Sequence, residues 1–134
     1  MGEAVVLKFD FLKPKDGKGQ PIKVEHLGEV KRGDIVLMYS PYVGCEAPFI
    51  SAEAAEWLAN KPIKLLGIQN IEIDESYESM AVHDNLLRNG IPIIENLVNL
   101  DKIKTNRVFY IGLPLRVHGL DSSWIRAIVL EKIS

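Results

Sequence analysis

Residues 82–100 read VHDNLLRNGIPIIENLVNL and predict a helix followed directly by a strand. Apolar side chains recur at helical spacing over residues 80–89, which indicates a helix with one buried face. Gly90 is suited to the position just past a helix end, because glycine adopts positive φ without steric cost. The apolar run at 91–97 then predicts a short strand.

Glu95 lies inside this predicted strand and is its most informative polar residue. Ile93 and Leu97 would share its face while Ile94 would lie on the other, which is typical of a strand covered on both sides. A carboxylate buried there needs a cation, a metal ion or several hydrogen-bond donors. The alternative is a strand-end glutamate that reaches solvent or pairs with a lysine, and the pattern favours neither.

The rest of the chain predicts about six strands and three helices, which define an α/β or α+β class with a mixed sheet. Ser51 is suited to cap the helix that follows it. Strands are expected at 4–11, 35–39, 63–68, 91–97, 107–113 and 124–132, and helices at 24–30, 51–60 and 80–89. The strand order is not fixed by the sequence.

Composition narrows the function classes without indicating a chemistry. The 134 residues suit one domain, and a formal charge of −2 offers no basic field for nucleic acid. The apolar runs are strand-sized, so we expect no membrane span. The only cysteine, Cys45, excludes an internal disulfide and fits a cytoplasmic protein.

Sequence motifs for catalysis or metal binding are absent. There is no nucleotide-binding glycine loop, no HExxH and no nucleophile elbow. His26, His83 and His118 show no metal-ligand spacing, and Cys45 has no histidine close in sequence. A histidine such as His83, on the border of a helix, is more often structural than a ligand.

Residues 82–100 nevertheless resemble a segment of the cyclase family of metal-dependent hydrolases, which includes bacterial kynurenine formamidase and isatin hydrolase. The resemblance covers nearly the whole chain and implies a swivelling three-layer β/β/α architecture. It also implies that residues 1–134 form a single cyclase-like domain that is N-terminally truncated relative to the family. The further matches lie at 2–7, 33–37, 113–115, 119–123 and 125–128.

The resemblance implies a metal-dependent amide hydrolase of the arylformamidase type. In the family, the residues at the positions of His83 and Glu95 bind the metal, usually Zn or Mn. Water activated by the metal would attack a formyl or cyclic amide. By the same resemblance, Asp121, Ser122 and Ser123 would lie near this small-molecule substrate. No catalytic residue is assigned.

The other family ligands belong to a His-x-Gly-Thr-His-x-Asp motif that this sequence lacks. Two ligands fall short of the three plus water that are typical of catalytic zinc. Three hypotheses follow. The chain is the C-terminal part of an active unit, it is a non-catalytic scaffold that binds or oligomerises, or His118 serves as a third ligand. Missing strands would also expose a sheet edge, which predicts a homo-oligomer or a partner chain supplying the motif.

Overall fold

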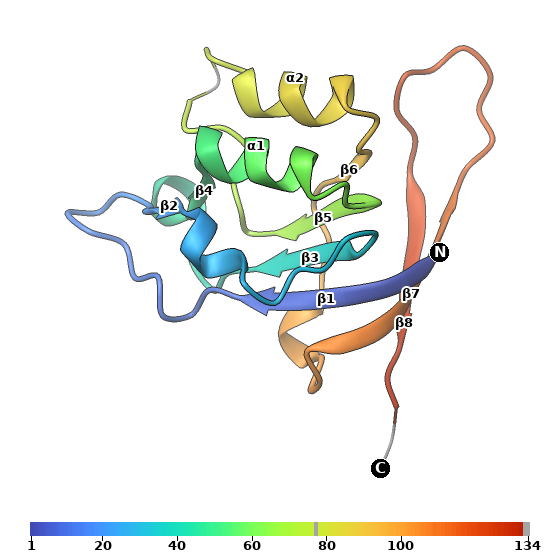
Figure 1. Cartoon of the computed structure of the whole chain (residues 1–134), viewed down its shortest axis with the longest axis horizontal. Helices are drawn as coiled ribbons and strands as arrows, with labels where there is room; N and C mark the ends of the chain where they lie inside the picture. The colour runs from blue at the N-terminus through green and yellow to red at the C-terminus, as the bar shows by residue number, and fades with distance from the viewer. Residues whose placement is uncertain (77, 133–134) are drawn as a thin grey trace.

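A curled mixed sheet of six strands forms the centre of the computed structural model, which describes residues 1–76 and 78–132 (Figure 1). The strand order is β6-β5-β3-β1-β7-β8. The first four strands in that order run parallel, whereas β7 runs antiparallel to both of its neighbours, β1 and β8. The bounds are β1 (Gly2–Lys8), β3 (Ile35–Tyr39), β5 (Leu65–Gln69), β6 (Ile93–Ile94), β7 (Arg107–Pro114) and β8 (Ile125–Leu130). The expected mixed α/β class is confirmed.

Two α-helices, α1 (Ala52–Asn60) and α2 (Ala81–Arg88), cover one face of the sheet (Figure 1). The expectation of three helices is wrong, because residues 24–30 form only a 3-10 turn at Val24–Leu27. Its hydrogen bond from the His26 N–H to the Lys23 carbonyl spans three residues, which is the 3-10 pattern. Two further 3-10 turns lie at Gly44–Glu46 and Leu100–Lys102, and a short parallel pair joins β2 (Pro21–Ile22) to β4 (Phe49–Ile50).

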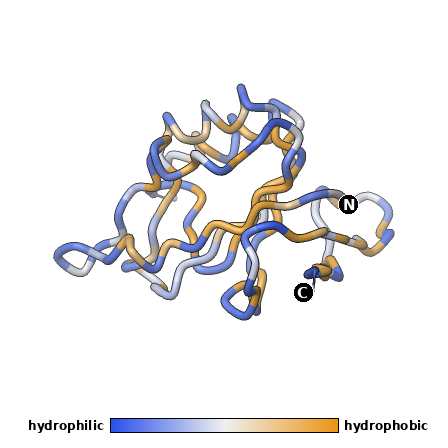
Figure 2. Tube along the Cα trace, turned by 60° about the horizontal axis from the view of Figure 1, so that its bottom comes forward, coloured by the Kyte–Doolittle hydropathy of each residue, from blue (hydrophilic) through white to orange (hydrophobic). Residues whose placement is uncertain are grey.

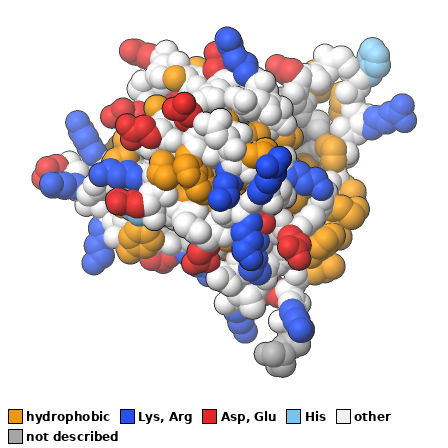
Figure 3. All heavy atoms as spheres, in the orientation of Figure 1, with side chains coloured by type: hydrophobic (Ala, Val, Ile, Leu, Met, Phe, Trp, Pro, Cys, Tyr) orange, Lys and Arg blue, Asp and Glu red, His pale blue; other side chains and the backbone are white. Residues whose placement is uncertain are grey.

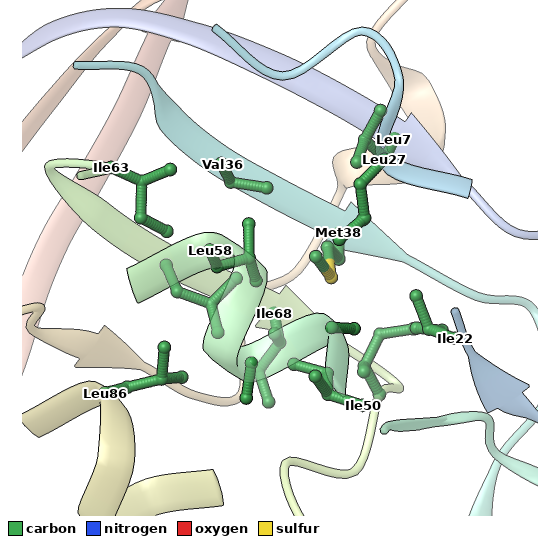
Figure 4. Close-up of a cluster of buried hydrophobic side chains, with 14 of the residues drawn as sticks. Leu7, Ile22, Leu27, Val36, Met38, Ile50, Leu58, Ile63, Ile68 and Leu86 are labelled. Carbon is green, nitrogen blue, oxygen red and sulfur yellow. The ribbon is translucent and has the colours of Figure 1, made fainter. Parts of the chain in front are cut away.

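Helix α1 begins where the sequence predicts. The Ser51 hydroxyl accepts a hydrogen bond from the Ala54 N–H at 3.2 Å and so satisfies one of the free donors of the first turn. Leu58 is fully buried between this helix and the sheet, where it packs in one cluster with Val36, Ile68 and Leu86 (Figure 4). The helix is therefore anchored at its start by a cap and along its length by apolar packing.

The central strands are apolar on both faces. On the face away from the helices, a second cluster contains Ala4, Val6, Leu37 and Tyr110, and the curl of the sheet brings β7 and β8 over it. Figure 2 shows hydrophobic stretches through the centre of the molecule and hydrophilic ones along the outer loops. The described helices include none that is long and apolar enough to cross a membrane.

Strand β6 is much shorter than the predicted strand at 91–97. It consists only of Ile93–Ile94, and the chain turns at Asn96, whose φ of 57° is left-handed. Glu95 consequently lies just past the strand end, with 53% of its side chain exposed. The argument that this carboxylate is buried between two layers is wrong, because the strand ends before it.

Strands β7 and β8 form a hairpin that projects from the body of the molecule, with its connecting loop at residues 115–124 (Figure 1). Its outer side carries much of the exposed apolar surface at the right of Figure 3. Strand β8 ends the sheet, so its outer edge has no partner strand within the described residues. The exposed large hydrophobic side chains of the hairpin are Phe109, Leu113, Leu115, Val117, Leu120, Trp124, Ile128 and Leu130.

Glu131 fastens the end of the hairpin to the loop before β7. One of its carboxylate oxygens accepts hydrogen bonds from the backbone N–H groups of Thr105 and Lys104, at 2.9 and 2.7 Å. These bonds hold the pKa of Glu131 below its ordinary value of 4.5. The carboxylate is therefore stabilised in the folded chain relative to the unfolded chain.

We expect the stabilisation from Glu131 to be lost in acid. Since the folded pKa lies below the unfolded one, the contribution is complete above about pH 4.5 and disappears as the pH falls through the folded pKa. The measurement compares the free energy of unfolding of the wild type with that of Glu131→Gln between pH 7 and pH 3. The difference should shrink below about pH 4.5, and a difference that stays constant over this range would refute the assignment.

Candidate functional site

A cavity of about 620 Å³ lies where the loops after the parallel strands meet. Its walls come from the segments that follow the carboxyl ends of β1, β3, β5 and β6, together with the start of α2. Ligands of open α/β sheets bind at this end of the strands. The polar side chains that line the cavity are Lys18, Cys45, Glu72, Asp74, Glu75, Ser76, His83 and Glu95.

His83 lies between two carboxylates in this cavity. Its Nδ1 is 2.5 Å from Asp74 Oδ2, and its Nε2 is 3.5 Å from Glu95 Oε1. Only 6% of the Asp74 side chain is exposed, against 21% for His83 and 53% for Glu95. The three side chains therefore form a row from the interior to the open side of the cavity.

The local sequence explains the position of Asp74. Buried Ile71 and Ile73 fix the loop after β5 against the core and bring Asp74 next to the start of α2. There its Oδ1 accepts a hydrogen bond from the Val82 N–H at 2.6 Å. Met80, at the N-cap position, makes no side-chain cap, so the carboxylate of Asp74 satisfies a free donor of the first helical turn.

The side chain of His83 points from helix α2 into the cavity, because the apolar face of this helix packs against the core. Val82 and Leu86 are buried there, one turn apart. Glu95 reaches the same point from the end of β6, which lies beside β5 in the sheet. His83 and Glu95, which the family resemblance pairs, are thus brought together by the fold.

Asp74 is the residue that the sequence analysis missed. It lies in the polar segment between the strand predicted at 63–68 and the helix predicted at 80–89, and nothing local distinguishes it from its acidic neighbours. The one feature of the sequence that could have pointed to Asp74 is the residue at the start of the predicted helix. Methionine is a poor N-cap, so a helix that begins at Met80 indicates an acceptor supplied from elsewhere in the chain.

The other predicted site residues lie elsewhere. His118, Asp121, Ser122 and Ser123 are exposed on the loop of the β7–β8 hairpin and do not line the cavity. Within residues 1–76 and 78–132, no group of three or more His, Cys, Asp or Glu side chains is arranged to hold a metal ion. The structure therefore does not bring His118 to the pair His83 and Glu95 as a third ligand.

His83 and Glu95 fit as two ligands of one divalent ion. Two ligands bound to a tetrahedral zinc at about 2.1 Å lie about 3.4 Å apart, and the observed separation of Nε2 and Oε1 is 3.5 Å. One nitrogen and one carboxylate oxygen suit Zn or Mn. The four carboxylates of the lining against a single lysine also favour a cation in this cavity.

A family model matches the N-terminal part of the chain. Residues 1–75 match the model of the family described as "Putative cyclase", and the chain belongs to that family. Asp74 lies inside the matched part, whereas His83 and Glu95 lie beyond it.

The curated relatives share part of this sequence. The kynurenine formamidase of Bacillus cytotoxicus is 36% identical over 83 residues, which are 61% of this chain and 39% of the relative. That of Polaromonas naphthalenivorans is 39% identical over 75 residues, 55% of this chain and 33% of the relative. The matched part thus spans about two fifths or less of the length of these relatives.

Solved structures match over almost the whole fold. A protein described as a potential metal-dependent hydrolase with cyclase activity superposes with a TM-score of 0.79 at 24% identity. The match covers 96% of this chain and 64% of the other. A predicted metal-dependent hydrolase from Bacillus stearothermophilus gives a TM-score of 0.77, also at 24% identity, over 96% of this chain and 62% of the other. These matches establish the fold.

Proposed function

We propose that the chain contributes two metal ligands, His83 Nε2 and Glu95 Oε1, to the site of a metal-dependent amide hydrolase. The observation that carries this proposal is their separation of 3.5 Å at the open side of the cavity. The names of the curated relatives, kynurenine formamidase, support a formyl amide as the substrate class.

Each residue would have a distinct task. His83 and Glu95 would hold the ion at the cavity, with Asp74 behind His83 as its buried partner. A bound divalent ion would supply Lewis acidity to an amide carbonyl and acidify a water molecule. Glu95, which lines the cavity with 53% of its side chain exposed, would lie on the side of the ion that a small amide can reach.

We propose further that the remaining ligands come from polypeptide outside these 134 residues. A catalytic zinc typically has three protein ligands, and the described part of this chain assembles two side chains suited to that role. A partner polypeptide that carries the histidine motif would complete the set.

The test is a complementation assay. The purified chain is mixed with Zn²⁺ or Mn²⁺ and with the part of the Bacillus cytotoxicus kynurenine formamidase that lies outside the match, and formate release from N-formylkynurenine is measured. We expect the mixture to release formate and the His83→Ala variant to lose this activity. The Arg88→Ala variant should keep its full activity, because the Arg88 side chain is exposed on the same helix. A mixture that binds no metal and releases no formate would contradict the proposal.

A further inference from the structure

We propose that Asp74 is a positioning residue that holds the ring of His83 with its proton on Nδ1. The unprotonated Nε2 is then presented to Glu95 and the cavity. The assignment of the proton follows from contacts within the chain, whereas its use for metal binding rests on the proposed function. Metal-bound histidines commonly donate their second ring N–H to a carboxylate in this way.

Both oxygens of Asp74 are engaged. Oδ1 accepts the hydrogen bond of the Val82 N–H at 2.6 Å, and Oδ2 lies 2.5 Å from His83 Nδ1. An ionised carboxylate accepts hydrogen bonds and donates none, so the proton of this short contact belongs to the ring nitrogen. Since Val82 and His83 are neighbours on α2, the same carboxylate fixes the helix start and the ring that follows it.

The position of the proton on Nδ1 determines what His83 Nε2 presents to the cavity. A neutral imidazole with its proton on Nδ1 has a lone pair on Nε2. That atom and Glu95 Oε1 are then two electron-rich atoms, 3.5 Å apart, that open on the same cavity. The pair favours a cation between them, and Asp74 determines that His83 offers a lone pair there instead of an N–H.

His26 provides an internal reference for the spectrum, because its contacts favour the opposite tautomer of the ring. The Lys23 N–H donates a hydrogen bond to His26 Nδ1 at 2.9 Å, so the neutral ring of His26 carries its proton on Nε2. One chain therefore holds two histidines whose backbone and carboxylate partners specify opposite tautomers. The contrast can be read in a single spectrum.

The first experiment is a long-range proton–nitrogen correlation spectrum of the ¹⁵N-labelled full chain at about pH 9, well above the ordinary histidine pKa of about 6.5. We expect the Nδ1–H pattern for His83 and the Nε2–H pattern for His26. In Asp74→Asn, the amide oxygen can still accept from Val82 while the amide N–H₂ faces Nδ1, so the His83 pattern should switch to Nε2–H.

The matched control is Asp84→Asn. Asp84 is the next residue on α2, is 64% exposed and lies 3.3 Å from Arg88 Nη2, so its replacement should leave both ring patterns unchanged. An Nε2–H pattern for His83 in the wild type would overturn the proposal without any variant. An unchanged His83 pattern in folded Asp74→Asn would also overturn it.

The second experiment measures Zn²⁺ affinity by calorimetry. We expect about a 10- to 100-fold weaker affinity in Asp74→Asn and an unchanged affinity in Asp84→Asn. Wild-type affinity in Asp74→Asn would overturn the positioning role while leaving the metal site intact. If the tautomer switches but the wild type binds no Zn²⁺ even with the complementing polypeptide, the proposed function fails and the assignment of the proton stands.

Discussion

We expect that replacing His83, the proposed metal ligand, with alanine weakens Zn²⁺ binding about 100-fold or more. Loss of an outer-shell partner of a metal ligand costs about 10- to 100-fold in affinity, so loss of the ligand itself costs at least as much. His83 Nδ1 contacts Asp74, and His83 Nε2 lies 3.5 Å from Glu95 Oε1. Alanine removes Nε2, which is one of the two proposed ligand atoms. The measurement is a Zn²⁺ titration by calorimetry, supported by the metal content of the purified chain.

The control for this experiment is His118→Ala. His118 lies on the exposed loop of the β7–β8 hairpin and does not line the cavity, so we expect its replacement to leave the affinity unchanged. Equal affinities for His83→Ala and the wild type would remove His83 from the metal site. A loss in His118→Ala as large as that in His83→Ala would instead show that the hairpin loop reaches the ion.

Replacing Arg107 with alanine will lower the free energy of unfolding by about 2–3 kcal/mol. Arg107 Nη1 lies 2.7 Å from Asp34 Oδ1, and its Nη2 donates to the Glu29 carbonyl at 2.7 Å. The Asp34 side chain is only 6% exposed, so the truncation leaves a nearly buried carboxylate without its cation. The cost is below that of a fully buried pair because 31% of the Arg107 side chain is exposed.

Arg88→Ala is the matched control for this ion pair. Arg88 and Asp84 are 80% and 64% exposed, lie 3.3 Å apart and are four residues apart on α2. Such a pair contributes about 0.5 kcal/mol or less. Urea unfolding of both variants gives the comparison. Equal losses would mean that burial of Asp34 does not set the strength of the Arg107 contact.

The sequence predicted those parts of the fold that local pattern determines. Ser51 and the apolar spacing after it located α1, and the run Ile35–Tyr39 forms β3 as expected. The pair of β2 and β4 was not predicted, because each strand has two residues and depends on hydrogen bonds to segments distant in the sequence. The length of β6 was overestimated for a related reason, since Asn96 turns the chain where the apolar pattern continues.

The candidate site could be predicted only in part. His83 and Glu95 were paired through the family resemblance, and their approach to 3.5 Å depends on the placement of β6 beside β5. Asp74 was missed because its partners, the Val82 N–H and His83, belong to a helix eight and nine residues further along the chain. A carboxylate that caps a helix from a preceding loop has no fixed spacing in sequence.

The outer face of the β7–β8 hairpin has a consequence for the colloidal behaviour of the chain. An edge strand that has no partner among the described residues and lies next to exposed apolar side chains such as Trp124, Ile128 and Leu130 is a template for adding strands from other molecules. A net charge of −2 provides little mutual repulsion to oppose this. We therefore expect this hairpin to be where self-association of the chain begins, and Ile128→Lys on its exposed face to raise the solubility.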